Sequence, residues 1–85
     1  MSDRFLASRT ALVTGSTSGI GLAIACGLAS AGAKIAINGL GTPEQIDTAL
    51  QAVRAAGADD VRHFGADLRY PDQIEAMMAA IDAWS

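Results

Sequence analysis

The sequence predicts an α/β fold with the order strand, helix, strand, helix, strand, helix. Three short apolar runs predict the strands, at residues 10–14, 34–38 and 61–65. Apolar residues at helical spacing follow each run and predict the three helices. Strands that alternate with helices of this length are parallel and are joined by right-handed crossovers. We therefore expect three parallel strands in the order 3-2-1, with helices on both faces of the sheet.

The first strand and the first helix are separated by a glycine-rich turn. The run from Thr10 to Thr14 does not alternate with polar residues through its centre, so we expect it to be buried on both faces. The helix is expected over residues 19–31, and Gly32 suits the position after its end, which commonly takes a positive φ. The predicted buried face consists of residues at helical spacing: Ile20, Ala23, Ile24, Gly27, Leu28 and Ala31.

The second helix has a clear start signal. Thr42 can cap it, Pro43 suits its first position, and Gln45 can complete a capping box. Gly57 marks its end. Its predicted buried stripe consists of Ile46, Ala49, Leu50 and Val53.

The third strand and the third helix carry weaker signals. His63, within the strand expected at 61–65, lacks partners at metal-ligand or catalytic spacing, so we interpret it as structural. The helix is expected to open at Tyr70-Pro71-Asp72, where tyrosine is a poor cap. Its predicted stripe consists of Ile74, Met77, Met78 and Ile81, with Trp84 in phase.

Composition excludes several classes of function. The chain has 85 residues, enough for one small domain, and 51% hydrophobic against 18% charged residues excludes a disordered tail. A net charge of −3 provides no basic surface for DNA or RNA. The N-terminus has no apolar signal segment and no run approaches 18 apolar residues, so we expect a cytoplasmic protein without membrane partners. A single cysteine, Cys26, excludes an internal disulfide and a multi-cysteine metal site, and we expect no bound metal.

The turn between the first strand and the first helix carries the chemistry. Gly15, Gly19 and Gly21 fall within the eight residues 14–21. Glycines here let the backbone approach a pyrophosphate, and the helix N-terminus offers free N–H groups and a partial positive charge. A phosphate-binding P-loop starting at Gly15 would need glycine and lysine where Ile20 and Gly21 stand, and a nucleophile elbow would need serine in place of Thr17.

The spacing Gly15-x-x-x-Gly19-x-Gly21 resembles the cofactor motif of the short-chain dehydrogenase/reductase family. Ala66-Asp67-Leu68 resembles the family's motif after the third strand, whose aspartate contacts the adenine amino group. The resemblance implies a partial Rossmann fold that binds a dinucleotide. It implies as cofactor-binding residues Gly15, Ser16, Ser18, Gly19, Ile20, Gly21, Asn38, Gly39, Leu40, Asp67 and Leu68.

The charge of the second strand's end bears on the choice of cofactor. In dinucleotide folds an acidic residue there binds the ribose 2′-hydroxyl of NAD, whereas arginine accommodates the 2′-phosphate of NADP. This chain has Asn38-Gly39-Leu40-Gly41, without either charge, and Ser18 is neutral where NADP-preferring relatives often carry a basic residue. Because no cation is at hand for a phosphate, we expect NAD rather than NADP.

Asn38-Gly39-Leu40-Gly41 also narrows the subfamily. It is similar to the D-3-hydroxybutyrate dehydrogenases, which tend to have Asn-Gly-aromatic-Gly, although Leu40 departs from that pattern. This resemblance implies hydride transfer between the nicotinamide and a small 3-hydroxy acid. The alternative is a 3-oxoacyl-carrier-protein reductase, an NADPH enzyme, which predicts basic residues near positions 18 or 39 that this chain lacks.

No residue can be assigned as catalytic. The family uses a Tyr-x-x-x-Lys pair with a serine, but the one tyrosine, Tyr70, is followed at the fourth position by Ile74, and the one lysine is Lys34. We therefore expect residues 1–85 to be the N-terminal NAD-binding portion of such an enzyme, without its catalytic half and inactive alone; intact family members are commonly homotetramers. A stand-alone nucleotide-binding module and a non-functional truncated product remain open as alternatives.

Overall fold

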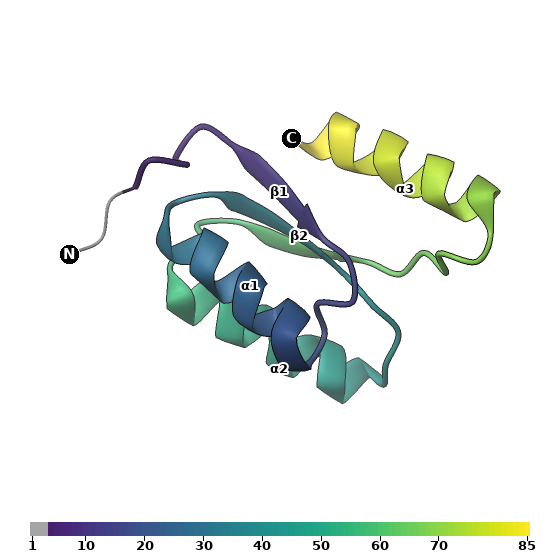
Figure 1. Cartoon of the computed structure of the whole chain (residues 1–85), viewed down its shortest axis with the longest axis horizontal. Coiled ribbons are helices and arrows are strands. Elements are labelled where there is room, and N and C mark those ends of the chain that lie inside the picture. The colour runs from purple at the N-terminus through teal and green to yellow at the C-terminus, as the bar shows by residue number, and fades with distance from the viewer. Residues whose placement is uncertain (1–3) are drawn as a thin grey trace.

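A computed structural model describes residues 4–85 and confirms the expected order of elements (Figure 1). The longest helices among these residues have 14 residues each, and none is long and apolar enough to cross a membrane. The elements are β1 (Thr10–Val13), α1 (Gly19–Ser30), β2 (Lys34–Asn38), α2 (Pro43–Ala56), β3 (Val61–Phe64) and α3 (Pro71–Trp84).

The three strands form one parallel sheet in the order β1-β2-β3, which confirms the predicted order 3-2-1. The central strand β2 is the most deeply buried, with Ile35, Ala36 and Ile37 fully inaccessible. β1 is only half-buried, so the expectation that it is buried on both faces is wrong. The physical reason is its position: among residues 4–85, β1 pairs with β2 alone and its other edge is open.

Helices cover both faces of the sheet, as predicted. In Figure 1, α1 and α2 lie on one side of the strands and α3 lies on the other. Successive residues of β2 supply both cores because strand side chains alternate. Ile35 and Ile37 pack with Ala29 and Val53 on the α1/α2 side, and Ala36 packs against α3 on the opposite side.

The buried face of α1 differs from the predicted one. Ile20 is 81% exposed and Ile24 is 51% exposed, whereas Ala25 and Ala29 are fully buried. Helical spacing could not identify the buried face because α1 is apolar on almost every side. The rotation of α1 is set instead by Gly21, which lies against the Gly15 carbonyl and puts the small residues four and eight positions later on the sheet.

The second helix forms as predicted. The Thr42 hydroxyl accepts a hydrogen bond from the Gln45 N–H (3.2 Å), and the Gln45 side chain accepts one from the Thr42 N–H (2.9 Å). This reciprocal pair is the expected capping box. Ala49 and Val53 are buried, as the predicted stripe requires.

The third helix contacts the sheet along a narrower line than predicted. Met77 and Ile81 are buried, but Met78 is 48% exposed, so its assignment to the core is wrong. The helix is held at its C-terminal end by Trp84, whose ring lies 5.7 Å from the ring of Phe64. The ammonium of Lys34 lies 4.4 Å from the centre of the indole ring, and the indole N–H donates to Asp60 (3.2 Å). Met77 and Ile81 pack with Ala36 of the sheet, and Met78 lies beside this contact line in solvent.

Candidate functional site

Three loops meet at the carboxyl ends of the strands, since parallel strands all end at the same edge of a sheet (Figure 1). The first loop is residues 14–18 between β1 and α1, the second is 39–42 between β2 and α2, and the third is 65–70 between β3 and α3. All the residues predicted to bind a cofactor lie in these loops, at the end of β2 or in the first turn of α1. The structure thus brings together three segments that are far apart in the sequence.

The three glycines of the turn are needed for two different reasons. Gly15 and Gly19 each have φ of +60°, a conformation that other residues rarely adopt. Gly21 has no such φ, but a Cβ there would overlap the Gly15 carbonyl. The turn therefore requires glycine for its backbone at two positions and for close packing at the third.

The N-terminus of α1 is left available for an anion. Ser18 is the N-cap residue, yet its side chain makes no capping hydrogen bond, and the first turn contains no acidic residue. Ile20, in that first turn, is largely exposed. Helix-terminal N–H groups without a side-chain cap, at the positive end of the helix dipole, are suited to bind phosphate oxygens.

Ser16 and Asn38 are buried and join the first loop to β2. Ser16 is fully buried and Asn38 is 2% exposed. The Ser16 N–H donates to the Asn38 carbonyl (2.7 Å), and the Asn38 N–H donates to the Ser16 hydroxyl (2.9 Å). The Asn38 side-chain amide donates to the carbonyls of Phe64 (2.9 Å) and Ala66 (3.0 Å). The contact expected between the Asn38 side chain and the ribose stays a prediction; in this conformation the amide nitrogen is turned toward the third loop.

The second loop is held by two residues that the sequence did not single out as site residues. Thr17 donates from its hydroxyl to the Leu40 carbonyl (3.3 Å), and a Cβ at Gly39 would lie 2.6 Å from that hydroxyl oxygen. His63 Nε2 lies 2.7 Å from the Gly39 carbonyl, so it carries the hydrogen of this bond. Leu40 itself is 67% exposed. No sequence motif indicated these contacts, because each joins residues more than 20 positions apart.

In the third loop Asp67 is paired with Arg69. The guanidinium donates to the carboxylate at 2.7 Å, and the Arg69 N–H donates to it at 3.0 Å. These hydrogen bonds lower the pKa of Asp67 from 3.8 to about 2, so the side chain is ionised at neutral pH. The Asp67 N–H donates to the side chain of Gln73 on α3 (2.8 Å). The sequence did not reveal Arg69 or Gln73 as site residues, because their role is to hold Asp67.

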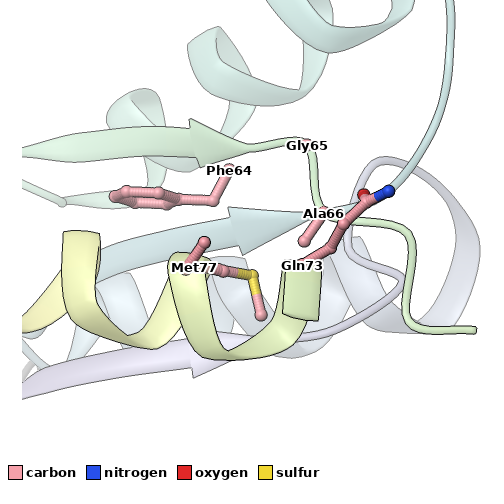
Figure 2. A pocket seen from close by; sticks show the side chains of 6 residues that line it. Phe64, Gly65, Ala66, Gln73 and Met77 are labelled. Carbon is pink, nitrogen blue, oxygen red and sulfur yellow. The ribbon is translucent and has the colours of Figure 1, made fainter. Parts of the chain in front are cut away.

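Two hollows flank the loops. One, of about 330 Å³, lies between the end of β3 and α3 and is lined by Phe64, Gly65, Ala66, Gln73, Ala76 and Met77. Figure 2 shows Gln73 reaching from α3 to the segment around Ala66, at the rim of this apolar hollow. The other, of about 410 Å³, lies at the start of α2 and is lined by Thr17, Thr42, Glu44, Gln45 and Thr48. Both fall in the size range of small-molecule sites.

The fold and the glycine turn define a nucleotide-binding α/β protein. A family model described as short chain dehydrogenase matches residues 9–84, and the chain belongs to this family, as the motif predicted. A D-beta-hydroxybutyrate dehydrogenase of Rhizobium meliloti is 49% identical over 74 residues, which are 87% of this chain and 29% of that protein. A 3-oxoacyl-acyl-carrier-protein reductase of Staphylococcus aureus is 32% identical over 74 residues, 87% of this chain and 30% of that protein. The chain thus spans less than a third of the length of these relatives.

Solved structures of the family share the fold. A metagenomic short-chain oxidoreductase solved with NADP has a TM-score of 0.82 at 32% identity, covering 92% of this chain and 34% of that one. An NADH-dependent reductase solved with NAD has a TM-score of 0.79 at 34% identity, and the match covers 91% of this chain and 32% of that one. The Rossmann-like class is therefore confirmed, and the family's cofactors are nicotinamide dinucleotides.

Replacing Gly21 with alanine tests the close approach of α1 to the first loop. Gly21→Ala is expected to lower the free energy of unfolding by about 1–3 kcal/mol, because the new methyl group overlaps the Gly15 carbonyl. Gly27→Ala is the matched control on the same helix, where a Cβ meets nothing within 4 Å, and it should stabilise the chain by about 0.5–1 kcal/mol. Urea unfolding followed by the fluorescence of the single tryptophan measures both; equal effects of the two variants would contradict this account.

The Asp67–Arg69 pair predicts a pH dependence of stability at acid pH. Because the pKa of Asp67 is lowered to about 2 in the folded chain, its contribution is present above its ordinary value of 3.8 and is lost as the pH falls toward 2. The wild type should therefore lose its advantage in stability over Asp67→Asn as the pH falls from about 4 to about 2. The measurement is the urea midpoint of both proteins across this range. The difference should be small and salt-sensitive since Arg69 is 79% exposed, and a pH-independent difference would contradict the pairing.

Proposed function

We propose that residues 1–85 form the NAD-binding portion of a short-chain dehydrogenase of the D-3-hydroxybutyrate type. The observation that carries the proposal is the turn in which Gly21 packs against the Gly15 carbonyl and leaves the N-terminus of α1 uncapped. Gly15, Ser16, Ser18, Gly19, Ile20 and Gly21 would surround the pyrophosphate. Gly39 and Leu40 would lie along the adenosine ribose, and Asp67 and Leu68 at the adenine. Asn38, expected from the sequence at the ribose, would contribute through the third loop, to which its side-chain amide is bonded.

The chain's contribution is to bind and orient the dinucleotide, whose nicotinamide supplies the hydride chemistry. The chain is acidic overall, so attraction of the pyrophosphate depends on the backbone N–H groups and the dipole at the start of α1. The ionised Asp67 would accept a hydrogen bond from the adenine amino group in exchange for one of its four contacts with Arg69, which is exposed and free to move aside. The exposed side chains of Leu40 and Leu68 provide apolar contacts for the adenosine.

The charges around the second loop favour NAD over NADP. The loop carries no cation of its own, and Arg69, in the third loop, is already bound to Asp67. The polar hollow beside the second loop is lined by Glu44, whose carboxylate would repel a 2′-phosphate. Because no cation would attract the 2′-phosphate of NADP and Glu44 would repel it, these charges support NAD as the cofactor.

The substrate proposal rests on the relatives. The 49% identity to a protein named D-beta-hydroxybutyrate dehydrogenase supports hydride transfer with a small 3-hydroxy acid by the whole enzyme. The alternative, a 3-oxoacyl-carrier-protein reductase using NADPH, is supported by the 32% relative but requires cations near positions 18 or 39. The second alternative, a stand-alone nucleotide-binding module without catalysis, requires only the three loops and the start of α1 described above.

Nucleotide binding by the purified chain tests the first part of the proposal. Calorimetry should give saturable binding of NAD and ADP and weaker binding of NADP, because the second loop offers no partner for the extra phosphate. Gly21→Ala should abolish binding of all three. Absence of saturable NAD binding at millimolar ligand would contradict the proposal, and tighter binding of NADP would favour the reductase alternative.

A chimaera tests the enzyme class. Residues 9–84 would replace the matching segment of the Rhizobium meliloti relative, and the graft should oxidise D-3-hydroxybutyrate with NAD in preference to NADP. Gly21→Ala within the graft is the control and should remove activity, since turnover then depends on the grafted turn. A graft that unfolds cooperatively but uses only NADP, or does not act on D-3-hydroxybutyrate, would contradict the proposal.

A further inference from the structure

Asn38 is the residue at which the three loops are connected. It is the last residue of β2, and both hydrogens of its side-chain amide are used. They are donated to the carbonyls of Phe64 and Ala66, at 2.9 and 3.0 Å, which stand on either side of Gly65. Because Ala66 directly precedes Asp67, this fork fixes the segment that carries the aspartate.

The main chain of Asn38 fixes the first loop separately. Its N–H and carbonyl form the reciprocal pair of hydrogen bonds with Ser16 at 2.9 and 2.7 Å. The Ser16 hydroxyl in turn donates to the carbonyl of Val13 at 2.6 Å. A substitution of the Asn38 side chain therefore removes the link to the third loop and keeps the main-chain link to the first loop.

The two carbonyl acceptors explain the choice of an amide at this position. A carboxylate has no hydrogen to donate, so an aspartate here would point a negative charge at two carbonyl oxygens in a buried place. Dinucleotide folds commonly place an acidic residue at the end of the second strand to bind the ribose. In this chain that place is occupied by a side chain that is 2% exposed and directed into the protein.

We infer that Asn38 is a positioning residue for the adenine half of the site, which it aligns through the third loop without touching the ribose. The inference rests on the proposed function, because it assumes that Asp67 contacts the adenine. It separates the site into two parts. The first loop and the start of α1 hold the pyrophosphate, and the third loop, held by Asn38, receives the adenine.

The test measures the two parts with two probes, ADP and inorganic pyrophosphate, on the full chain. Asn38→Asp is expected to weaken ADP binding roughly tenfold or more, since two carbonyls lose their donor and Asp67 loses its position. Pyrophosphate binding should change by no more than about twofold, because the main-chain bonds to Ser16 remain. Ser16→Ala is expected to weaken pyrophosphate binding more than Asn38→Asp does, which a general loss of stability would not produce.

Two further variants keep the test decisive. Gln51→Glu makes the same change from amide to carboxylate on the exposed surface of α2 and should leave the binding of both probes unchanged. Asn38→Ala removes the amide without burying a charge, so it replaces Asn38→Asp if the latter does not fold. It should show the same selective loss of ADP binding, together with faster amide hydrogen exchange at residues 65–69.

The outcomes distinguish the inference from the proposed function. If Asn38→Asp binds ADP and NAD as tightly as the wild type and discriminates more strongly against NADP, the side chain faces the ribose and the inference is overturned. An equal loss of ADP and pyrophosphate binding would also overturn it, since the role would then be general stability. If the wild type binds no nucleotide, the proposed function fails, and hydrogen exchange at residues 65–69 that does not change in Asn38→Ala would separately overturn the inference.

Discussion

Gly21 packs so closely against the Gly15 carbonyl that a single methyl group at position 21 would overlap it. This close approach brings the start of α1 against the turn that leaves β1 and fixes the rotation of the helix. Ala25 and Ala29 then follow at intervals of four residues and allow α1 to lie close to the sheet. At the same end of the helix the Ser18 side chain makes no capping hydrogen bond, so the first N–H groups of α1 are available to an anion at the site edge.

The fixed rotation of α1 determines the surface of the molecule. The helix is apolar on two faces, and the face that carries Ile20 and Ile24 is directed away from the core. A second exposed surface is the edge of β1, which is open among the described residues. A sheet edge with apolar side chains is a surface that proteins normally pair or cover. On the opposite side, α3 is held by the buried Met77 and Ile81 and, at its C-terminal end, by Trp84, whose ring lies at a tilt beside Phe64 and under the ammonium of Lys34.

The site is held together by backbone groups that distant side chains align. Asn38, Thr17 and His63 each bind a carbonyl in another loop, and Gln73 binds the N–H of Asp67. Such contacts between buried or half-buried polar groups orient loops at the edge of a rigid sheet, where binding residues commonly lie. The loops present glycine backbone, two exposed leucines and one paired carboxylate, a set that suits a dinucleotide better than a small ion.

The order of elements, the capping box of α2, the parallel sheet and the glycine turn could all be predicted from the sequence, because they depend on local spacing and on backbone conformations that few residues adopt. The sequence also located the three loops of the site. The folded structure was needed to show which face of α1 is buried, that Met78 is exposed, that Asn38 is directed inward, and that Arg69 holds Asp67. These depend on contacts between residues distant in the chain, or on the direction of a side chain, for which the spacing of residues carries no signal. An apolar helix can be buried on any side, and an amide at a strand end can face either a ligand or a neighbouring loop, so the packing of the whole chain makes the choice.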